Sequence, residues 1–373
     1  MIKVWQREFE RFGSTPRLWW LVVFIPPLVA LTLGLIFSER TPHGLPVVLV
    51  DFDQTPQSRQ LQRAFDSTSG VALVSGEPDL GKAATRVRQG QAHAVLVIPT
   101  GFARELIRGD QPRIQIYTNR QASTSGNVVL SNVTMATVTA GFEAGLARGI
   151  LPAALVDARA LFNPGLDFSR FLALPLTVAV LHVLMVVVAI DVTGRELRER
   201  TADQWLASAD GQAGQALVAK LLPYFAWFCL YGGLILWLMV RAMSVEIAGS
   251  AGYWLLGWAC LVAACFGLGV FLMALLSNLR LATSVASILV SPAFAYSGMT
   301  FPNFAMSGFA AFWSTVLPLH HFLHFQTGQL AMGASIQAGA WHLLSLLLVA
   351  LLPLLAWGRW QRLLSDPAQW GKA

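Results

Sequence analysis

Charged side chains are scarce in this sequence. Only 12% of its 373 residues are Asp, Glu, Lys or Arg, 55% are hydrophobic, and the mean hydropathy is +0.56. Soluble domains carry roughly 25% charged residues, so we expect a membrane protein with some soluble mass. The net charge of +6 includes no Lys/Arg-rich tract with interleaved aromatic residues. We therefore expect no nucleic-acid partner.

Cysteine is scarcer still. The three cysteines, Cys229, Cys260 and Cys265, all lie in apolar runs, where a thiol behaves as a small hydrophobic group. Residues 38–168 contain none, so this part is expected to fold without disulfides, and a thiolate metal site has no support. The apolar runs also lack a nucleophile elbow, paired zinc ligands and an acidic dyad. We therefore disfavour a membrane-embedded enzyme and expect no metal or cofactor.

A phosphate-binding loop is missing as well. The nearest approach is Gly76–Ala83, which lies between a predicted strand and a predicted helix. Ala83 offers no hydroxyl to magnesium, Glu77 and Asp79 would repel phosphate, and Pro78 removes a backbone donor. The chain is therefore expected to depend on a separate protein for any ATP hydrolysis.

Long apolar runs dominate what is present. Six of them approach the roughly 20 residues that cross a bilayer. They cover residues 18–37, 171–192, 217–240, 253–276, 281–298 and 340–357. Ahead of them, Ile2, Trp5, Phe9 and Phe12 share one helical face, which predicts a cytoplasmic interfacial helix within residues 1–17. The first run is too long for a cleavable signal peptide. We predict an α-helical membrane protein with six transmembrane helices.

Basic residues are distributed unequally between the predicted loops. Twelve Lys or Arg residues lie in segments on one side of the membrane, whereas the short loops on the other side hold only Arg241. The twelve are Lys3, Arg7, Arg11, Arg17, Arg195, Arg198, Arg200, Lys220, Arg280, Arg359, Arg362 and Lys372. Because short basic segments stay in the cytoplasm, both termini are predicted to be cytoplasmic.

Residues 299–339 contain no Lys, Arg, Asp or Glu. This stretch begins where Ser297–Pro302 interrupts the fifth apolar run, and it is too rich in aromatic residues for a free loop. We predict short re-entrant helices that dip into the outer leaflet, where irregular backbone is tolerated only when it packs on protein. A short seventh span is the alternative.

Residues 38–168 are soluble in character, with 12 basic and 11 acidic residues. Strands are predicted at 46–50, 71–74, 94–98 and 113–117, and helices at 57–66, 79–89 and 100–108. This alternation indicates a small extracytoplasmic α/β domain with a mainly parallel sheet, inserted between the first two spans. Helices at 123–148 and 152–161 are expected to return the chain to the membrane as a stalk.

A charged amphipathic stretch separates the second and third apolar runs. Within the predicted cytoplasmic segment 193–216, residues 198–207 spell Arg-Glu-Arg-Thr-Ala-Asp-Gln-Trp-Leu-Ala. Such a mixture of charges cannot lie in lipid and is suited to contact with a soluble partner. The expected contact residues are Arg198, Glu199, Arg200, Thr201, Asp203, Trp205 and Leu206.

Several motifs resemble the permease subunits of bacterial ABC exporters, in the multidrug or lipid branch with a large insert after the first span. The coupling segment of that family has Gly-Thr and then paired apolar residues, where this chain has Arg200-Thr201 and Trp205-Leu206. Other similar stretches are Val50–Ser58, Gly90–Phe102, Lys220–Tyr224, Ser297–Pro302 and Leu317–His321. Arg200, Ala219 and Leu317 stand where the family has Gly, Gly and Asn. The motifs keep the family's order over nearly the whole chain.

The resemblance implies a permease of the bacterial inner membrane that exports hydrophobic or amphipathic compounds. It implies two separate ABC ATPase subunits that dock on the coupling segment, a second permease subunit, and contact with membrane lipids. A periplasmic adaptor is a further candidate partner. The candidate pathway residues are His182, Pro292, Phe301 and Pro302. A non-transporting receptor or scaffold with an external sensing domain is the alternative function.

Ionisable residues within apolar runs are candidates for function because they are costly in a membrane. His182 lies deep in the second run, and Asp191 lies near its end, close to Arg195. His320 and His324 lie one helical turn apart near the predicted outer face, with His321 beside them. Since no acidic residue or cysteine accompanies these three histidines, we favour polar anchoring at the interface over metal binding.

Overall fold

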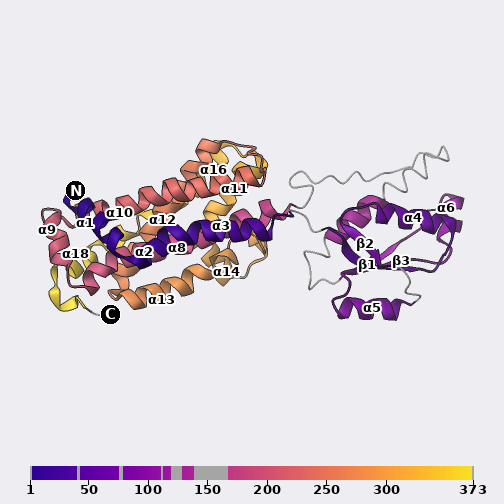
Figure 1. Ribbon diagram of the computed structural model, residues 1–373, viewed down its shortest axis with the longest axis horizontal. Helices are drawn as coiled ribbons and strands as arrows, with labels where there is room; N and C mark the ends of the chain where they lie inside the picture. Colours follow the sequence, from indigo (N-terminus) through magenta and orange to yellow (C-terminus); the bar gives the residue numbers. More distant parts are fainter. Residues whose placement is uncertain are drawn as a thin grey trace. The chain divides into compact units, whose positions relative to one another are not determined.

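The computed structural model describes residues 2–39, 43–74, 79–110, 112–118, 128–137 and 167–371. The chain divides into two compact units (Figure 1). One, called here the helical unit, contains residues 1–38 and 167–373, and the other, the α/β unit, contains residues 39–166. The division falls where the apolar composition of the sequence gives way to a charged one.

The helical unit contains seven principal apolar helices among its described residues. They are α3 (Ile25–Ile36), α8 (Leu174–Arg198), α10 (Ala213–Trp227), α11 (Gly233–Ala242), α12 (Ala251–Leu276), α13 (Leu279–Val290) and α16 (Ile336–Ala350). The other helices are α1 (Ile2–Ser14), α2 (Pro16–Trp19), α9 (Ala202–Ser208), α14 (Gly308–Val316), α15 (Pro318–Thr327), α17 (Leu352–Leu355) and α18 (Trp357–Ser365). A π-helical turn at Phe228–Gly232 joins α10 to α11, so these two form one continuous helix.

Four helices among the described residues are long and apolar enough to cross a membrane. They are Ser169–Arg198, Ala213–Ala242, Ala251–Leu276 and Ile336–Leu355. These coincide with the second, third, fourth and sixth apolar runs of the sequence. The first and fifth runs form the shorter apolar helices Trp20–Ile36 and Leu279–Phe294. The chain is therefore an α-helical membrane protein, and the number of six spans stays a prediction.

Helix α12 packs against both α8 and α16, and glycines bring these backbones close together. A Cβ atom on Gly269 would lie 2.7 Å from the Cβ of Ala189 on α8. One on Gly267 would lie 2.7 Å from the Cα of Ala350 on α16. Small residues at helix contacts permit close van der Waals packing, which drives association where lipid removes the hydrophobic driving force. Larger side chains at these two positions would separate the helices.

The uncharged stretch after α13 forms the short helices α14 and α15, divided at Pro318. Helix α15 is mostly buried and packs against α12 and α16. Helix α14 instead exposes Phe309 and Phe312. Short helices were expected here, and their depth in a membrane stays a prediction.

The α/β unit is built on a four-stranded sheet in the order β2-β1-β3-β4. The strands are β1 (Leu45–Asp51), β2 (Val71–Val74), β3 (Ala94–Ile98) and β4 (Gln115–Thr118). The first three are parallel, and β4 runs antiparallel to β3. Helices α4 (Pro56–Asp66) and α6 (Phe102–Arg108) cover one face, and α5 (Leu80–Arg88) covers the other (Figure 1).

The loops that follow β1 and β3 are joined through Asp53. Its carboxylate accepts hydrogen bonds from the backbone N–H groups of Gly101 (2.9 Å) and Ala103 (3.0 Å) at the start of α6. Burial disfavours the charged form, but hydrogen bonds from the Thr55 hydroxyl and these amides outweigh it and lower the pKa of Asp53. Two motifs that are separate in the sequence, Val50–Ser58 and Gly90–Phe102, thus form one structural junction.

Part of the expected local structure lies outside the described residues. Of the predicted stalk helices, the structure describes only Val128–Thr137, which is helical and packs on the α4 and α6 face of the sheet. Residues 75–78 of the loop that approaches a phosphate-binding motif also lie outside the described residues. The next residue, Asp79, caps the N-terminus of α5 by accepting from the Gly81 N–H.

Candidate coupling site

The chain leaves α8 through a left-handed turn at Arg200. This residue has a φ of +58°, in the region that favours glycine and costs other residues roughly 1–2 kcal/mol. The turn lets the Thr201 N–H donate to the carbonyl of Glu196 at 2.9 Å, and α9 follows immediately. Glycine would adopt this turn without strain, whereas Arg200 does not.

Residues 198–207, called here the coupling segment, contain all the expected contact residues, and these differ in exposure. Exposed or partly exposed are Arg198, Glu199, Arg200 and Asp203, while Thr201 and Leu206 are half-buried. Trp205 is fully buried: its Nε1 donates to the Ala216 carbonyl at 3.2 Å, and its ring meets that of Trp360 edge to face. The Lys220 Nζ lies 5.1 Å from the centre of the same ring. Trp205 therefore anchors α9 to α10 and α18, and its contact with a partner stays a prediction.

A charged network lies beneath the coupling segment. It comprises Glu8, Glu196 and Lys220, with Arg7 and Arg11 at its edge. Lys220 donates to Glu196 at 2.8 Å and also to Glu8, and at most 3% of any of these three side chains is exposed. Because the three residues lie on α1, α8 and α10, the network ties these helices together.

Glu196 is the most highly shared group of the charged network. Besides Lys220, its carboxylate accepts from Arg7 at 2.8 Å, from Arg11 and from the Thr201 hydroxyl. Thr201 is the N-terminal flanking residue of α9, yet its hydroxyl bonds to Glu196 and not to the helix. The network therefore reaches the coupling segment directly.

Helix α1 has an exposed apolar face and a charged face that packs against protein. Ile2 and Phe9 are exposed, at 71% and 67%, as suits contact with lipid acyl chains. On the charged face, Glu8 is buried and Arg7 and Arg11 turn toward Glu196. Burying charge inside protein is tolerable here because each group has an oppositely charged partner.

The candidate pathway residues differ in their exposure. His182 is fully buried, and neither ring nitrogen has a hydrogen-bond partner among the described residues. Pro292 is exposed in a 3-10 turn after α13, and Phe301 and Pro302 are exposed in the following loop. His182 therefore lacks direct access to the surface that carries the other three.

The three clustered histidines are joined by His342 of α16. The ring centres of His320 and His324 are 4.4 Å apart, and those of His324 and His342 are 5.9 Å apart. The Asn303 amide lies 3.4 Å from Nδ1 of His320 and 3.3 Å from Nε2 of His324. In the described part of the chain, no group of three His, Cys, Asp or Glu residues is arranged to hold a metal ion. The cluster connects the loop before α14 to α15 and α16.

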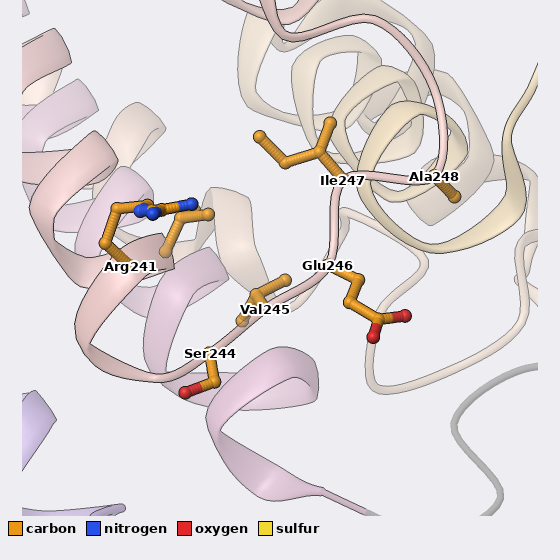
Figure 2. Close-up of a pocket in the computed structure, with 7 residues that line it drawn as sticks. Arg241, Ser244, Val245, Glu246, Ile247 and Ala248 are labelled. Atoms are coloured by element: carbon orange, nitrogen blue, oxygen red, sulfur yellow. The ribbon is translucent and has the colours of Figure 1, made fainter.

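A cavity of about 710 Å³ lies in the loop between α11 and α12 (Figure 2). It is lined by Val240, Arg241, Ser244, Val245, Glu246, Ile247 and Ala248. Figure 2 shows the Glu246 carboxylate pointing away from Arg241, so these two charges do not face one ligand position. The cavity lies at the opposite end of the helix 213–242 from Lys220 and is separate from the charged network.

The long apolar helices define a multi-pass membrane protein. The family model for the ABC-2 family transporter protein matches residues 16–359, and the chain belongs to this family. It is the permease subunit of an ABC transporter, the membrane component that associates with separate ABC ATPase subunits. No curated protein matches the chain.

Proposed function

We propose that this permease exports hydrophobic or amphipathic compounds, drug-like or lipid-like, across the bacterial inner membrane. ATPase subunits would dock on the exposed residues Arg198, Glu199, Arg200 and Asp203, with Thr201 and Leu206 beside them. The observation that carries this proposal is the direct bond between the coupling segment and the charged network. Through it, a displacement of α9 would reach α1, α8 and α10 together.

The proposed orientation of the helical unit is supported by the distribution of its charge. Helices α1, α9 and α18 lie at one end (Figure 1), and most of the basic residues of the unit belong to segments at that end. Because basic segments stay in the cytoplasm, this end would face the ATPases, and both termini would be cytoplasmic. The α/β unit would then lie outside, where it could meet a periplasmic adaptor.

Coupling requires that docking distinguish two states of the permease, because a ligand shifts an equilibrium only by its differential affinity for them. The buried ion pairs make independent movement of α1, α8 and α10 costly. Breaking one buried pair costs about 3–5 kcal/mol, since it leaves a charge without compensation. A displacement of α9 that is transmitted by the hydrogen bond from Thr201 to Glu196 would therefore move the cytoplasmic ends of α1, α8 and α10 together.

The substrate class is inferred from the apolar character of the spans. Helix α3 leaves Leu28, Leu31 and Leu35 exposed, and α13 leaves Leu281 and Ile288 exposed. Such faces suit lipid or a second permease subunit, and a pathway between two subunits would be lined by apolar side chains. Sugars and ions would need polar groups there, whereas amphipathic compounds entering from the bilayer would not.

The proposal is tested by reversing the exposed charges of the coupling segment. The variant Arg198→Glu/Asp203→Lys should lower ATPase co-purification in mild detergent by about tenfold, and substrate-stimulated ATP hydrolysis should fall with it. The matched control is Arg241→Glu, an exposed arginine at the other end of the helix 213–242. It should retain both properties.

Two results would contradict the proposal. If no ATPase co-purified with the wild-type protein, even after crosslinking in intact cells, the receptor or scaffold alternative would be favoured. If the Arg198→Glu/Asp203→Lys variant exported hydrophobic dyes from inside cells at the wild-type rate, the coupling assignment would be lost.

A further inference from the structure

The segment after α17 lies against the coupling segment. Its helix α18 buries Trp360, Leu363 and Leu364 and exposes Arg359 and Arg362. Figure 1 places α18 beside α9, and the edge-to-face contact of Trp360 with Trp205, whose ring centres are 6.3 Å apart, joins the two helices. Helix α18 therefore packs against α9 and helps to hold it in place.

The residues that follow α18 return to the turn at which α8 ends. The Gly371 N–H donates to the carbonyl of Leu197 at 2.8 Å. Gly371 also packs beneath the guanidinium of Arg200, because a Cβ atom added to it would lie 2.6 Å from Nε of Arg200. The left-handed turn at Arg200 is thus covered on one side by Gly371.

This returning stretch has a defined internal structure. Asp366 accepts from the Ala368 N–H at 3.1 Å and from the Gln369 amide at 3.0 Å. The Trp370 Nε1 donates to the Leu363 carbonyl at 2.8 Å, which folds the stretch back over α18. A set of specific hydrogen bonds across 357–371 indicates a structural element with a fixed position relative to α9.

We propose that residues 357–371 are a second element of the ATPase-docking platform, next to α9. Helix α18 carries two arginines and no acidic residue, and Arg359 and Arg362, three positions apart, lie on its exposed side. We expect them to face an acidic patch on the ATPase surface. This inference rests on the proposed docking of the ATPase at the coupling segment.

An anionic membrane surface is the competing occupant for the two arginines, because basic amphipathic helices also bind anionic lipid. The ATPase is favoured as the occupant because α18 adjoins the coupling segment. Trp360, which α18 buries, contacts Trp205 of α9, and Gly371 contacts the turn at Arg200, so α18 lies next to the segment that carries Asp203.

The test uses the full transporter complex in nanodiscs, with a photo-crosslinking amino acid in place of Asp203, Arg359 or Arg241. We expect crosslinks to the ATPase from positions 203 and 359 and none from 241. Crosslinking from 203 but not from 359 would overturn the inference and leave the proposed function intact. A failure at 203 as well would reject ATPase docking at the coupling segment itself.

The lipid alternative is separated by the double variant Arg359→Glu/Arg362→Glu. We expect it to bind the ATPase about tenfold more weakly in nanodiscs of purely zwitterionic lipid and in discs that contain anionic lipid. A loss confined to the anionic discs would assign the arginines to the membrane surface and overturn the inference, as would unchanged binding in both.

Discussion

Removing the charge of Glu196 should destabilise the helical unit more than any other single neutralisation of a carboxylate at the coupling end. The substitution Glu196→Gln keeps the size and shape of the side chain. It leaves Lys220 with Glu8 as its remaining carboxylate, and it removes the negative charge that Arg7 and Arg11 share. In the substituted network, one carboxylate would face three cations.

The magnitude follows from the burial of both partners. Glu196 is 0% exposed and Lys220 is 1% exposed, so solvent screens their interaction little. Removing one partner of such a buried pair costs about 3–5 kcal/mol. The glutamine oxygen can still accept one hydrogen bond, which favours the lower limit of about 3 kcal/mol. For a unit of this size we expect a fall in thermal midpoint of about 6–12 °C.

The assay is thermal unfolding of the purified chain in detergent, followed by tryptophan fluorescence. The matched control is Glu199→Gln, the same substitution three residues away. Glu199 is 40% exposed and pairs with Arg11 at 3.4 Å, and such surface pairs contribute roughly 0–1 kcal/mol. Equal midpoints for the two variants, within about 2 °C, would refute the view that the charged network holds α1, α8 and α10 together.

Three further predictions concern other positions. Arg200→Gly should raise the thermal midpoint by about 2 °C through relief of left-handed strain, and a lower midpoint would show that its contact with Gly371 outweighs the strain. The lowered pKa of Asp53 means that its ionised form stabilises the α/β unit above its unfolded pKa of about 3.9, and that this contribution disappears as the pH falls through the lower, folded value. Limited proteolysis of the α/β unit should therefore accelerate below about pH 4, and Asp53→Asn should already be cleaved faster at pH 7. Gly298→Ala should impair export while ATPase binding persists, because φ is +87° and the added Cβ would lie 2.8 Å from Nε2 of His324. Normal dye export by this variant would show that the loop before α14 tolerates the displacement.

Much of the local structure could be predicted because it depends on patterns of neighbouring residues. The strands observed at 71–74 and 94–98 coincide with the predicted ones, since continuous apolar runs bounded by polar residues specify buried strands. The fourth strand begins at Gln115, two residues later than predicted. Hydropathy located the long helices, but it could not tell that a π-helical turn at Phe228–Gly232 would join α10 and α11.

The candidate site was predictable only in its exposed part. The alternation of charges along 198–207 indicated a surface segment, and several of those residues are exposed. The charged network was missed because its members are 24 to 212 positions apart in the sequence. Lys220 within the apolar run 217–240 was the available signal, since an ionisable residue there requires a partner. The identity of that partner depends on tertiary packing, which no local pattern encodes.

The separation of exposed and buried charges gives the coupling proposal its sharpest consequence. Neutralising an exposed contact residue such as Asp203 should weaken ATPase binding without lowering the thermal midpoint. Glu196→Gln should do the reverse: the ATPase would still find the exposed surface, but a movement of α9 would no longer be transmitted faithfully to α1 and α10. ATP hydrolysis in this variant should therefore continue while its stimulation by substrate is lost. If hydrolysis and stimulation instead fell in proportion, the charged network would contribute only stability, and coupling would have to pass through the apolar contacts of Trp205.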